Sequence, residues 1–258
     1  MTEDNCLELQ FELLNGLFFD NKEETDDYVL CSSKVLDDQF WNIAFIKNKV
    51  NNDVIKKLED RFIEIYRTPS MYIGRSSIYY QDNKNILIAN GYRLQDTDVF
   101  LKLDNKMNID INLNIKVIEN EKEYDDFMKV LSSAYNDSSE NPEENVYEGA
   151  ITKCYYDAIK NTINSKEHMH IIAYDNDIPV SVATLNYVNG IGSINSVGTA
   201  QGHWNKGYGK QLIAFIINKF EELGGGELIL NTEYQSKNQK FYEKLGFKEM
   251  YVLEQYVK

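Results

Sequence analysis

The sequence is poor in the residues that build disulfides and in long apolar segments. Its 258 residues include three cysteines, and these form no CxxC pair. We therefore expect Cys6, Cys31 and Cys154 to be reduced thiols that pack as small apolar side chains. No apolar run approaches the roughly 18 residues that a membrane-spanning helix needs, and the acidic start "MTEDNCLELQ" lacks the apolar region of a secretory signal. These absences predict a cytoplasmic protein without a membrane partner.

Positive charge is also scarce. The chain has 27 Lys and Arg against 41 Asp and Glu, which gives a formal net charge of −14 at pH 7. A surface of that sign repels phosphate backbones, so we do not expect a nucleic-acid partner. The same surface attracts cations, including amines. With 43% hydrophobic residues, a chain of this length can bury one large core or two smaller ones.

Histidine occurs three times. His168 and His170 alternate along a predicted strand and therefore share a face, but two imidazoles without a suitably spaced third ligand do not make a metal site. We expect no metal cofactor and interpret both histidines as surface or edge-strand residues. His203 precedes a glycine-rich segment, where it can serve as a helix cap. The sequence contains neither a Ser-His-Asp arrangement nor a Walker motif.

Helical and strand patterns alternate along the chain, which predicts an α/β protein. A strand that ends at Leu103 gives way to a polar stretch, so we place a domain boundary near residue 110. The part that follows, residues 111–258, shows a regular order of elements. Strands are expected at 114–120, 169–175, 179–188, 192–200, 227–232 and 247–257, and helices at 121–135, 146–163, 208–223 and 236–245.

The N-terminal part, residues 1–110, ends in a similar order. A helical pattern lies within residues 51–68, and strands are expected at 70–74 and 93–103. Sliding the sequence by about 155 residues overlays these elements on those of the C-terminal part and places Gly91-Tyr92 on Gly246-Phe247. This pattern indicates a diverged internal duplication.

The stretch "NKGYGK", residues 205–210, places two glycines directly before a long apolar helix. The start of a helix has unpaired backbone N–H groups and a partial positive charge. Glycine lets an anion approach those groups closely, and Lys206 and Lys210 add charge. The stretch is therefore a candidate pyrophosphate cradle, although a Gly-x-Gly at a helix start is more often ordinary turn chemistry.

A second candidate motif is "SKNQKFYEKLGF", residues 236–247. Its Tyr242 lies four residues before Gly246, which ends the predicted helix, so the phenol is expected to leave the last helical turn. Tyr242 can alternatively be a core residue. Phe241 and Phe247 are the more obviously buried aromatic residues of this motif.

Taken together, residues 112–258 resemble the GNAT superfamily of N-acetyltransferases. The family's acetyl-CoA signature, Q/R-x-x-G-x-G/A, corresponds here to "WNKGYG", with Trp204 in the position of the usual Gln or Arg. The family's later signature corresponds to "NQKFYEKLGF". The resemblance implies a GNAT fold, a mixed central sheet flanked by helices. The overlaid first half resembles the inactive half of tandem family members, because it lacks the motifs. Near the positions of Gly207, Gly209 and Tyr242 it has Asn52, Val54 and Leu87. We therefore predict a degenerate GNAT-like domain at residues 1–110 and a catalytic domain at 111–258.

The resemblance also implies the site. The strand segment around Gly198 would pair with the pantetheine arm of acetyl-CoA, the cosubstrate, through the amides of Val197 and Thr199. Asn238 would contact the pantetheine or phosphate region, and Tyr242 would protonate the departing thiolate, since a phenol with a pKa near 10 is protonated at neutral pH. The pyrophosphate would be held by the backbone N–H groups of Asn205, Lys206, Gly207, Tyr208, Gly209 and Lys210.

The acceptor amine would attack the thioester directly, but the general base is missing from its usual strand. Asn195 or Ser193 could position a water molecule there. Glu233, after the next strand, is the nearest carboxylate, and a solvated surface glutamate is its simpler interpretation.

The segment at residues 138–156 is expected to cover the acceptor. It is acidic and aromatic, which suits a cationic amine of a small molecule or a peptide; a solvated acidic loop is an equal interpretation. Trp204 and the missing base favour an alternative function, a non-catalytic tandem module that binds CoA or a protein partner. Transfer of a longer acyl chain, and a monomer or a homodimer, remain open. The acidic and aromatic residues of the segment at 138–156 are Glu140, Glu143, Glu144, Tyr147, Glu148, Tyr155 and Tyr156.

Overall fold

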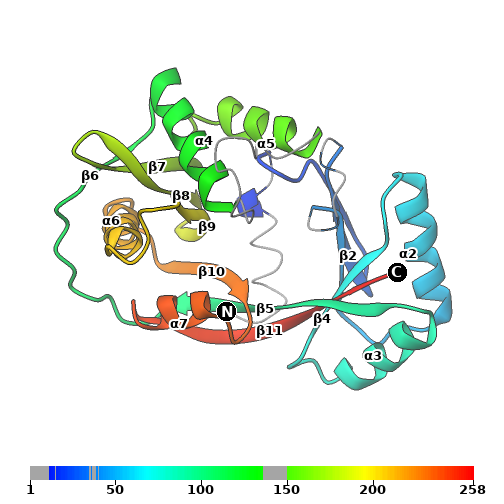
Figure 1. The fold of residues 1–258 in the computed structure, drawn as a ribbon. Coiled ribbons are helices and arrows are strands. Elements are labelled where there is room, and N and C mark those ends of the chain that lie inside the picture. Colours follow the sequence, from blue (N-terminus) through cyan, green and yellow to red (C-terminus); the bar gives the residue numbers. More distant parts are fainter. Residues whose placement is uncertain (1–11, 15, 35, 37–38, 40, 136–149) are drawn as a thin grey trace. The chain divides into compact units, whose positions relative to one another are not determined.

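The computed structural model describes residues 12–258 except residues 15, 35, 37–38, 40 and 136–149 (Figure 1). The chain divides into two compact units. Unit 1 comprises Met1–Leu101, Asn231–Glu243 and Lys248–Lys258, and unit 2 comprises Lys102–Leu230 and Lys244–Phe247. The units interleave along the sequence, whereas the predicted boundary near residue 110 divides the chain once. The assignment of residues 1–110 to a degenerate domain remains a prediction.

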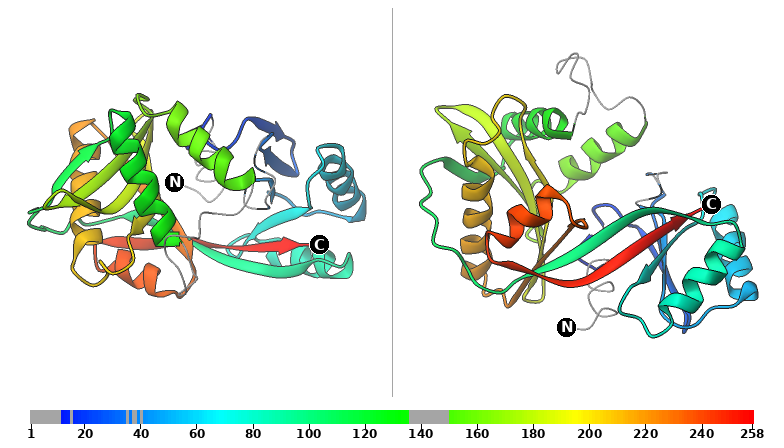
Figure 2. Two further views of the ribbon diagram at one scale, coloured as in Figure 1. Left: turned by 45° about the horizontal axis from the view of Figure 1, so that its top comes forward. Right: turned by 60° about the horizontal axis from the view of Figure 1, so that its bottom comes forward.

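Unit 1 is built around a sheet whose strand order is β1-β2-β3-β4-β11-β5. The pairs β1–β2, β2–β3 and β4–β11 are antiparallel, and β3–β4 is parallel. Figure 2 shows the long strands β5 and β11 running side by side. The elements are β1 (Asn21–Glu24), β2 (Tyr28–Ser32), β3 (Ile43–Ile46), α2 (Asn52–Glu64), β4 (Ser70–Gly74), α3 (Tyr80–Ala89), β5 (Arg93–Leu103), α7 (Lys237–Glu243) and β11 (Phe247–Val257).

Helix α2 shows why this part of the sequence is helical. The side chain of Asn51 caps the helix by accepting a hydrogen bond from the Val54 amide at 3.0 Å. Ile55, Leu58 and Phe62 follow at helical spacing and are fully buried. They pack into the main core of unit 1, which also contains residues of β2, β3, β4 and α3, together with Tyr256 of β11.

The C-terminal strand β11 lies between β4 and β5 in the sheet of unit 1. It pairs with β4 from Leu253↔Gly74 to Val257↔Ser70. This register places the carboxylate of Glu254, which is 2% exposed, 2.8 Å from Arg75 and 3.3 Å from Lys84. The Tyr256 hydroxyl donates to the same carboxylate at 2.6 Å. The last strand of the chain thus supplies the anion that pairs with two cations, Arg75 directly after β4 and Lys84 in α3.

Unit 2 is built around a second run of strands in the order β10-β9-β8-β7-β6. The pairs β6–β7, β7–β8 and β8–β9 are antiparallel, and β9–β10 is parallel. Three strands carry residues of both units: β5, β10 and β11. The elements are β6 (Asn114–Val117), α4 (Glu121–Tyr135), α5 (Ala150–Asn161), β7 (His168–Asp175), β8 (Ile178–Val188), β9 (Ile191–Thr199), α6 (Tyr208–Glu222) and β10 (Glu227–Glu233).

Helices cover both faces of β7–β9 in unit 2 (Figure 1). On one face, Phe127 of α4 lies edge-on to His170 of β7, with ring centroids 5.6 Å apart. On the other face, Phe220 of α6 approaches Gly192 of β9 so closely that a Cβ there would be 2.7 Å from its ring. Because both faces are covered, the strands carry almost continuous buried runs, such as residues 168–174 of β7.

These observations confirm the predicted mixed sheet flanked by helices. The expected strands at 114–120, 169–175, 179–188 and 247–257 are present as β6, β7, β8 and β11. Strands β1, β2 and β3 had no sequence-based expectation. Within the described part of the chain, no helix is long and apolar enough to cross a membrane.

The Glu254 network predicts how unit 1 responds to mutation and pH. Replacing Glu254 with Gln should lower the free energy of unfolding by about 1–3 kcal/mol, because charge-assisted hydrogen bonds are lost and two cations remain unneutralised. Burial alone would raise the pKa of Glu254, but hydrogen bonds from Tyr256, Tyr80, Arg75 and Lys84 outweigh it and hold the pKa below its ordinary value of 4.5. The stabilisation is therefore present above about pH 4.5 and is lost as the pH falls through the lowered pKa.

Urea unfolding at several pH values measures this effect. The difference between wild type and Glu254→Gln should be full at pH 7 and should shrink below pH 4.5. Asp60→Asn serves as a matched control, since Asp60 is an exposed carboxylate on α2 and should change stability by less than about 0.5 kcal/mol. A difference that stays constant down to pH 3 would contradict the assigned role of the carboxylate.

Candidate functional site

The end of β9 departs from regular strand pairing. Its parallel register with β10 runs from Ile191↔Glu227 to Ile194↔Leu230, although β9 continues to Thr199. On its other edge, the register with β8 passes from Thr184↔Asn195 to Val182↔Gly198, so β9 contains one extra residue. This is a β-bulge, and Ser196 within it has a φ of +53°. A bulge re-aims backbone groups and often lies beside a functional site.

Side chains hold the carbonyl groups of three successive residues at this strand end. The Tyr135 hydroxyl donates to the Val197 carbonyl at 3.1 Å. The Ser181 hydroxyl donates to the Gly198 carbonyl at 2.8 Å, and the indole Nε1 of Trp204 donates to the Thr199 carbonyl at 2.8 Å. Each carbonyl has two lone pairs, so these contacts fix the segment and still leave room for a second donor.

Helix α4 also fixes this segment, and it explains Gly198. A Cβ at residue 198 would be 2.7 Å from the Cβ of Ala134, so only glycine permits this approach. The hydroxyl of Ser133 accepts a hydrogen bond from the Gln201 amide at 3.0 Å. The C-terminal turn of α4 therefore packs directly on β9 and on the loop that follows it.

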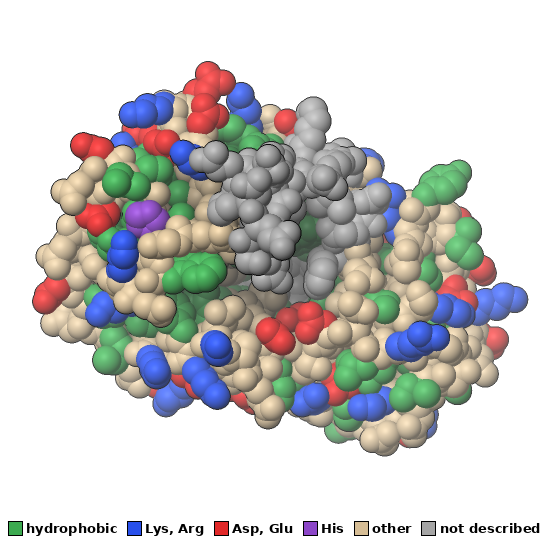
Figure 3. All heavy atoms as spheres, viewed as in Figure 1, with side chains coloured by type: hydrophobic (Ala, Val, Ile, Leu, Met, Phe, Trp, Pro, Cys, Tyr) green, Lys and Arg blue, Asp and Glu red, His purple; other side chains and the backbone are tan. Residues whose placement is uncertain are grey.

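The loop leads into α6 through Gly207, which is the N-cap residue of this helix. Gly207 has a φ of +80°, in the left-handed region that favours glycine, and it forms no side-chain cap. The first backbone N–H groups of α6 therefore lack intrahelical acceptors. Lys206 and Lys210 are both exposed here, and Figure 3 shows Lys and Arg side chains on this face of the molecule. Together these groups make an anion-binding end.

Two further features of this loop bear on whether an anionic ligand fits: one hydrogen bond and one buried atom without a partner in the described part of the chain. The Tyr208 hydroxyl donates to the Asp175 carboxylate, and this bond raises the pKa of Tyr208. It also keeps the acidic group of Asp175 engaged. The Nδ1 atom of His203 is buried and has no hydrogen-bond partner among the described residues. A loop with an unsatisfied polar atom and uncapped helix amides is incomplete alone, as expected of a segment that binds a ligand.

The remaining predicted residues lie on α7, in unit 1. Ser236 and Gln239 cap this helix: the Ser236 hydroxyl accepts from the Gln239 amide at 3.1 Å, and the Gln239 side chain accepts from the Gln235 amide at 2.6 Å. Asn238 is exposed, whereas Tyr242 is 8% exposed and lies edge-on to Phe241. Tyr242 is thus the better buried of these two aromatic residues.

The structure therefore brings most of the predicted cofactor residues together within unit 2. Val197, Gly198 and Thr199 end β9, and residues 205–210 form the following loop and the start of α6. Asn238 and Tyr242 belong to unit 1. Of the predicted acceptor segment, Glu140, Glu143, Glu144, Tyr147 and Glu148 lie outside the described residues, as does the side chain of Tyr155. Tyr156 is described, and its hydroxyl lies 3.0 Å from that of Ser132.

The interpretation of His168 and His170 as surface or edge-strand residues is wrong. Both are buried, and β7 is paired on both edges. His168 Nδ1 lies 2.9 Å from Asn186 Oδ1 and His170 Nδ1 lies 2.9 Å from Thr184 Oγ1, each across the β7–β8 pair. Burial, with a smaller contribution from His168, lowers the pKa of His170 to about 3. The imidazole of His170 is therefore neutral at physiological pH.

The hydrogen bonds that start at His168 and Asn186 continue onto β9. There they include Ser193 and Asn195, the residues considered for positioning a water molecule. Ser193 is buried and accepts hydrogen bonds from Asn186 at 3.3 Å and from Asn195 at 2.7 Å. Ser193 is thus part of the buried network. Asn195 is partly exposed and directly precedes the bulge.

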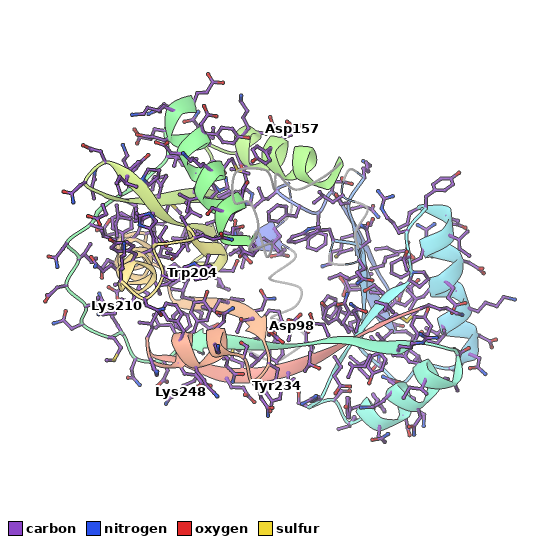
Figure 4. All side chains as sticks on the ribbon, in the orientation of Figure 1. Asp98, Asp157, Trp204, Lys210, Tyr234 and Lys248 are labelled. Carbon is purple, nitrogen blue, oxygen red and sulfur yellow. The ribbon has the colours of Figure 1, made fainter. Side chains whose placement is uncertain are left out.

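Asp98 of β5, in unit 1, is a functional candidate that the sequence reasoning missed (Figure 4). Burial and the negative charges of Asp96 and Glu233 raise the pKa of Asp98 to about 6, against the lowering effect of a 3.2 Å hydrogen bond from Tyr72. A carboxyl with a pKa near neutrality suits proton transfer. The alternating acids in "DTD" were visible in the sequence, but their burial was not.

Residues 128–247 match the model of the acetyltransferase (GNAT) family. This range contains the β9 bulge, the α6 start and Tyr242. Comparison with curated protein sequences gives no match.

Solved structures similar to this chain confirm the GNAT fold. A functionally unknown conserved protein from Staphylococcus epidermidis aligns with a TM-score of 0.71 and 12% identity over 96% of both chains. A GCN5-related N-acetyltransferase from Kribbella flavida aligns with a TM-score of 0.69 and 13% identity over 100% of this chain and 96% of that one. A tandem GNAT protein from the clavulanic acid biosynthesis pathway aligns with a TM-score of 0.56 and 10% identity over 90% and 78%.

The contact between α4 and β9 predicts a specific packing defect. Gly198→Ala should lower the free energy of unfolding by about 1–3 kcal/mol, because the new methyl group overlaps that of Ala134. Chemical denaturation of the purified variant measures the change.

The compensating substitution Ala134→Gly tests the cause. In the double variant the overlap disappears, so the two changes should cost less together than the sum of their separate costs. Costs that simply add would show that the two positions do not touch.

Proposed function

Residues 128–247 belong to the acetyltransferase (GNAT) family, and on this basis we propose that the chain transfers an acetyl group from acetyl-CoA to a primary amine. The observation that carries the proposal is the junction of β9 and α6. An irregular strand end with side-chain-held carbonyls is followed by a helix start that has a left-handed glycine and two flanking lysines. One junction of this kind suits a ligand with an extended amide-bearing arm joined to phosphates.

In this proposal the groups of unit 2 bind the donor. The strand segment Val197–Thr199 pairs with the amide-bearing arm in the manner of an added strand. Lys206, Lys210 and the first amides of α6 neutralise the phosphates. Acetyl-CoA supplies the acyl group as an activated thioester.

The chemical step forms a carbon–nitrogen bond and breaks a carbon–sulfur bond. Tyr242 donates the phenolic proton to the departing sulfur and regains a proton from solvent. The acceptor ammonium loses one proton to a base before it attacks, and the nitrogen loses a second proton as the carbon–sulfur bond breaks, so the products are an amide, a free thiol and one released proton. Asp98 and Glu233 are the two candidates for this base, and a pKa raised to about 6 leaves the Asp98 carboxylate mostly ionised at pH 7.5.

The acceptor class follows from charge. The protein carries a net charge of −14, which attracts cations, so the proposed acceptor is a cationic amine of a small molecule or a peptide. The alternative function is a non-catalytic module that binds CoA or a protein partner, and the following experiments separate the two.

Calorimetric titration with acetyl-CoA tests the cradle first. The wild type should bind with a micromolar dissociation constant, and the double variant Gly207→Val, Gly209→Val should lose binding, because a valine at a φ of +80° distorts the helix start. Because valine at this φ also strains the folded state, Lys210→Ala provides a milder test. Its matched control is Lys219→Ala at the opposite end of α6, which should leave binding intact. No binding to the wild type would favour the partner-binding alternative.

The pH profile of thiol release, measured with an amine panel, tests the acid and the base. Wild-type kcat/KM should fall as the pH drops below about 6, as Asp98 becomes protonated. Asp98→Asn should reduce kcat/KM by about 10²–10⁴-fold and abolish this acid limb. Asp96→Asn should move the limb to lower pH, because it removes a charge that raises the pKa of Asp98.

Tyr242→Phe should lower the rate at every pH and leave both the acid limb and CoA affinity unchanged. A limb that persists in Asp98→Asn would remove Asp98 as the base. A full rate in Tyr242→Phe would remove Tyr242 as the acid.

A further inference from the structure

Trp204 stands out among the exposed apolar side chains because its orientation is fixed. The indole is 57% exposed, yet its N–H donates to the Thr199 carbonyl at 2.8 Å. The polar atom of the side chain is thus satisfied by the protein. What remains in solvent is flat aromatic surface, held in place from one edge.

The position of this surface is as informative as its exposure. Trp204 lies between the end of β9, which it contacts, and the anion-binding start of α6, three residues further along the chain (Figure 4). Lys206 and Gly207 lie two and three residues after Trp204. A rigid aromatic face therefore borders a site for phosphate.

A ligand that satisfies both features must carry phosphates and a flat ring within a short distance of each other. Nucleotides have this chemistry, and every nucleobase can stack on an aromatic side chain. Building on the proposed function, we propose that Trp204 stacks on the adenine base of the CoA donor while the α6 start holds its phosphates. The tryptophan, which stands where relatives with the signature carry Gln or Arg, then adds recognition of the base.

The competing explanation is that Trp204 only ties the loop to β9 through its N–H. Two substitutions separate these roles. Trp204→Phe removes the N–H and keeps an aromatic ring, whereas Trp204→Leu removes both. If stacking matters, the phenylalanine variant should bind CoA more tightly than the leucine variant, although both have lost the tie to Thr199.

Two probes separate base recognition from phosphate recognition. CoA contains adenosine, and 4′-phosphopantetheine lacks it. Calorimetry should show that Trp204→Leu weakens CoA by about 5- to 150-fold, the range for one base–aromatic stack. Its affinity for 4′-phosphopantetheine should change by less than about twofold.

Fluorescence gives an independent readout. The chain has two tryptophans, and Trp41 stacks on Phe18 with ring centroids 4.3 Å apart. In the conservative variant Trp41→Phe, all indole emission comes from Trp204. Saturating CoA should quench that emission, and 4′-phosphopantetheine should not.

The outcomes are distinct. If CoA binds but Trp204→Leu binds it as tightly as wild type, or if the Trp204 emission is unchanged at saturation, stacking is overturned while the proposed function stands. If both probes weaken equally in Trp204→Leu and Trp204→Phe, the tie to Thr199 is the role of the side chain. If neither probe binds the wild type, the proposed function fails and this inference fails with it.

Discussion

The insertion of β11 between β4 and β5 is the constraint on which unit 1 depends. The strand at the C-terminal end of the sequence, β11, completes the sheet of unit 1, whose other strands precede residue 104. It also brings the buried carboxylate of Glu254 to Arg75 and Lys84. A cut near residue 110 would leave β4 with an unpaired edge and two cations without their partner. The first half of the sequence therefore does not contain all that its own sheet requires.

Local patterns in the sequence predicted most elements, but not their partners. The apolar spacing in α6 and the alternation in β11 depend on neighbouring residues, which a reader of the sequence can see. The pairing of β11 with β4 joins residues about 180 positions apart, and no local pattern encodes it. The prediction that His168 and His170 lie at the surface or on an edge strand failed for a related reason. Their partners Asn186 and Thr184 lie on the next strand, so the sequence showed the shared face but not what covered it.

In the candidate site, too, some features were predictable from the sequence and others depend on the folded chain. The sequence identified Gly198 and Gly207, and the structure gives each a separate physical cause: the approach of Ala134 at the first and a left-handed backbone at the second. The bulge at Ser196 was not predictable, because serine has no preference for positive φ. Asp98 was missed because a raised pKa arises from burial and neighbouring charges, which depend on the folded chain.

The hydrogen bonds at the end of β9 also limit what the site can bind. The carbonyls of Val197, Gly198 and Thr199 already accept side-chain donors, whereas the first amides of α6 have no intrahelical acceptor. The backbone of this region therefore offers an excess of donors. A ligand rich in acceptors, such as phosphate and carbonyl oxygens, gains most from it, and because the segment is held in advance by Tyr135, Ser181 and Trp204, binding loses little conformational entropy.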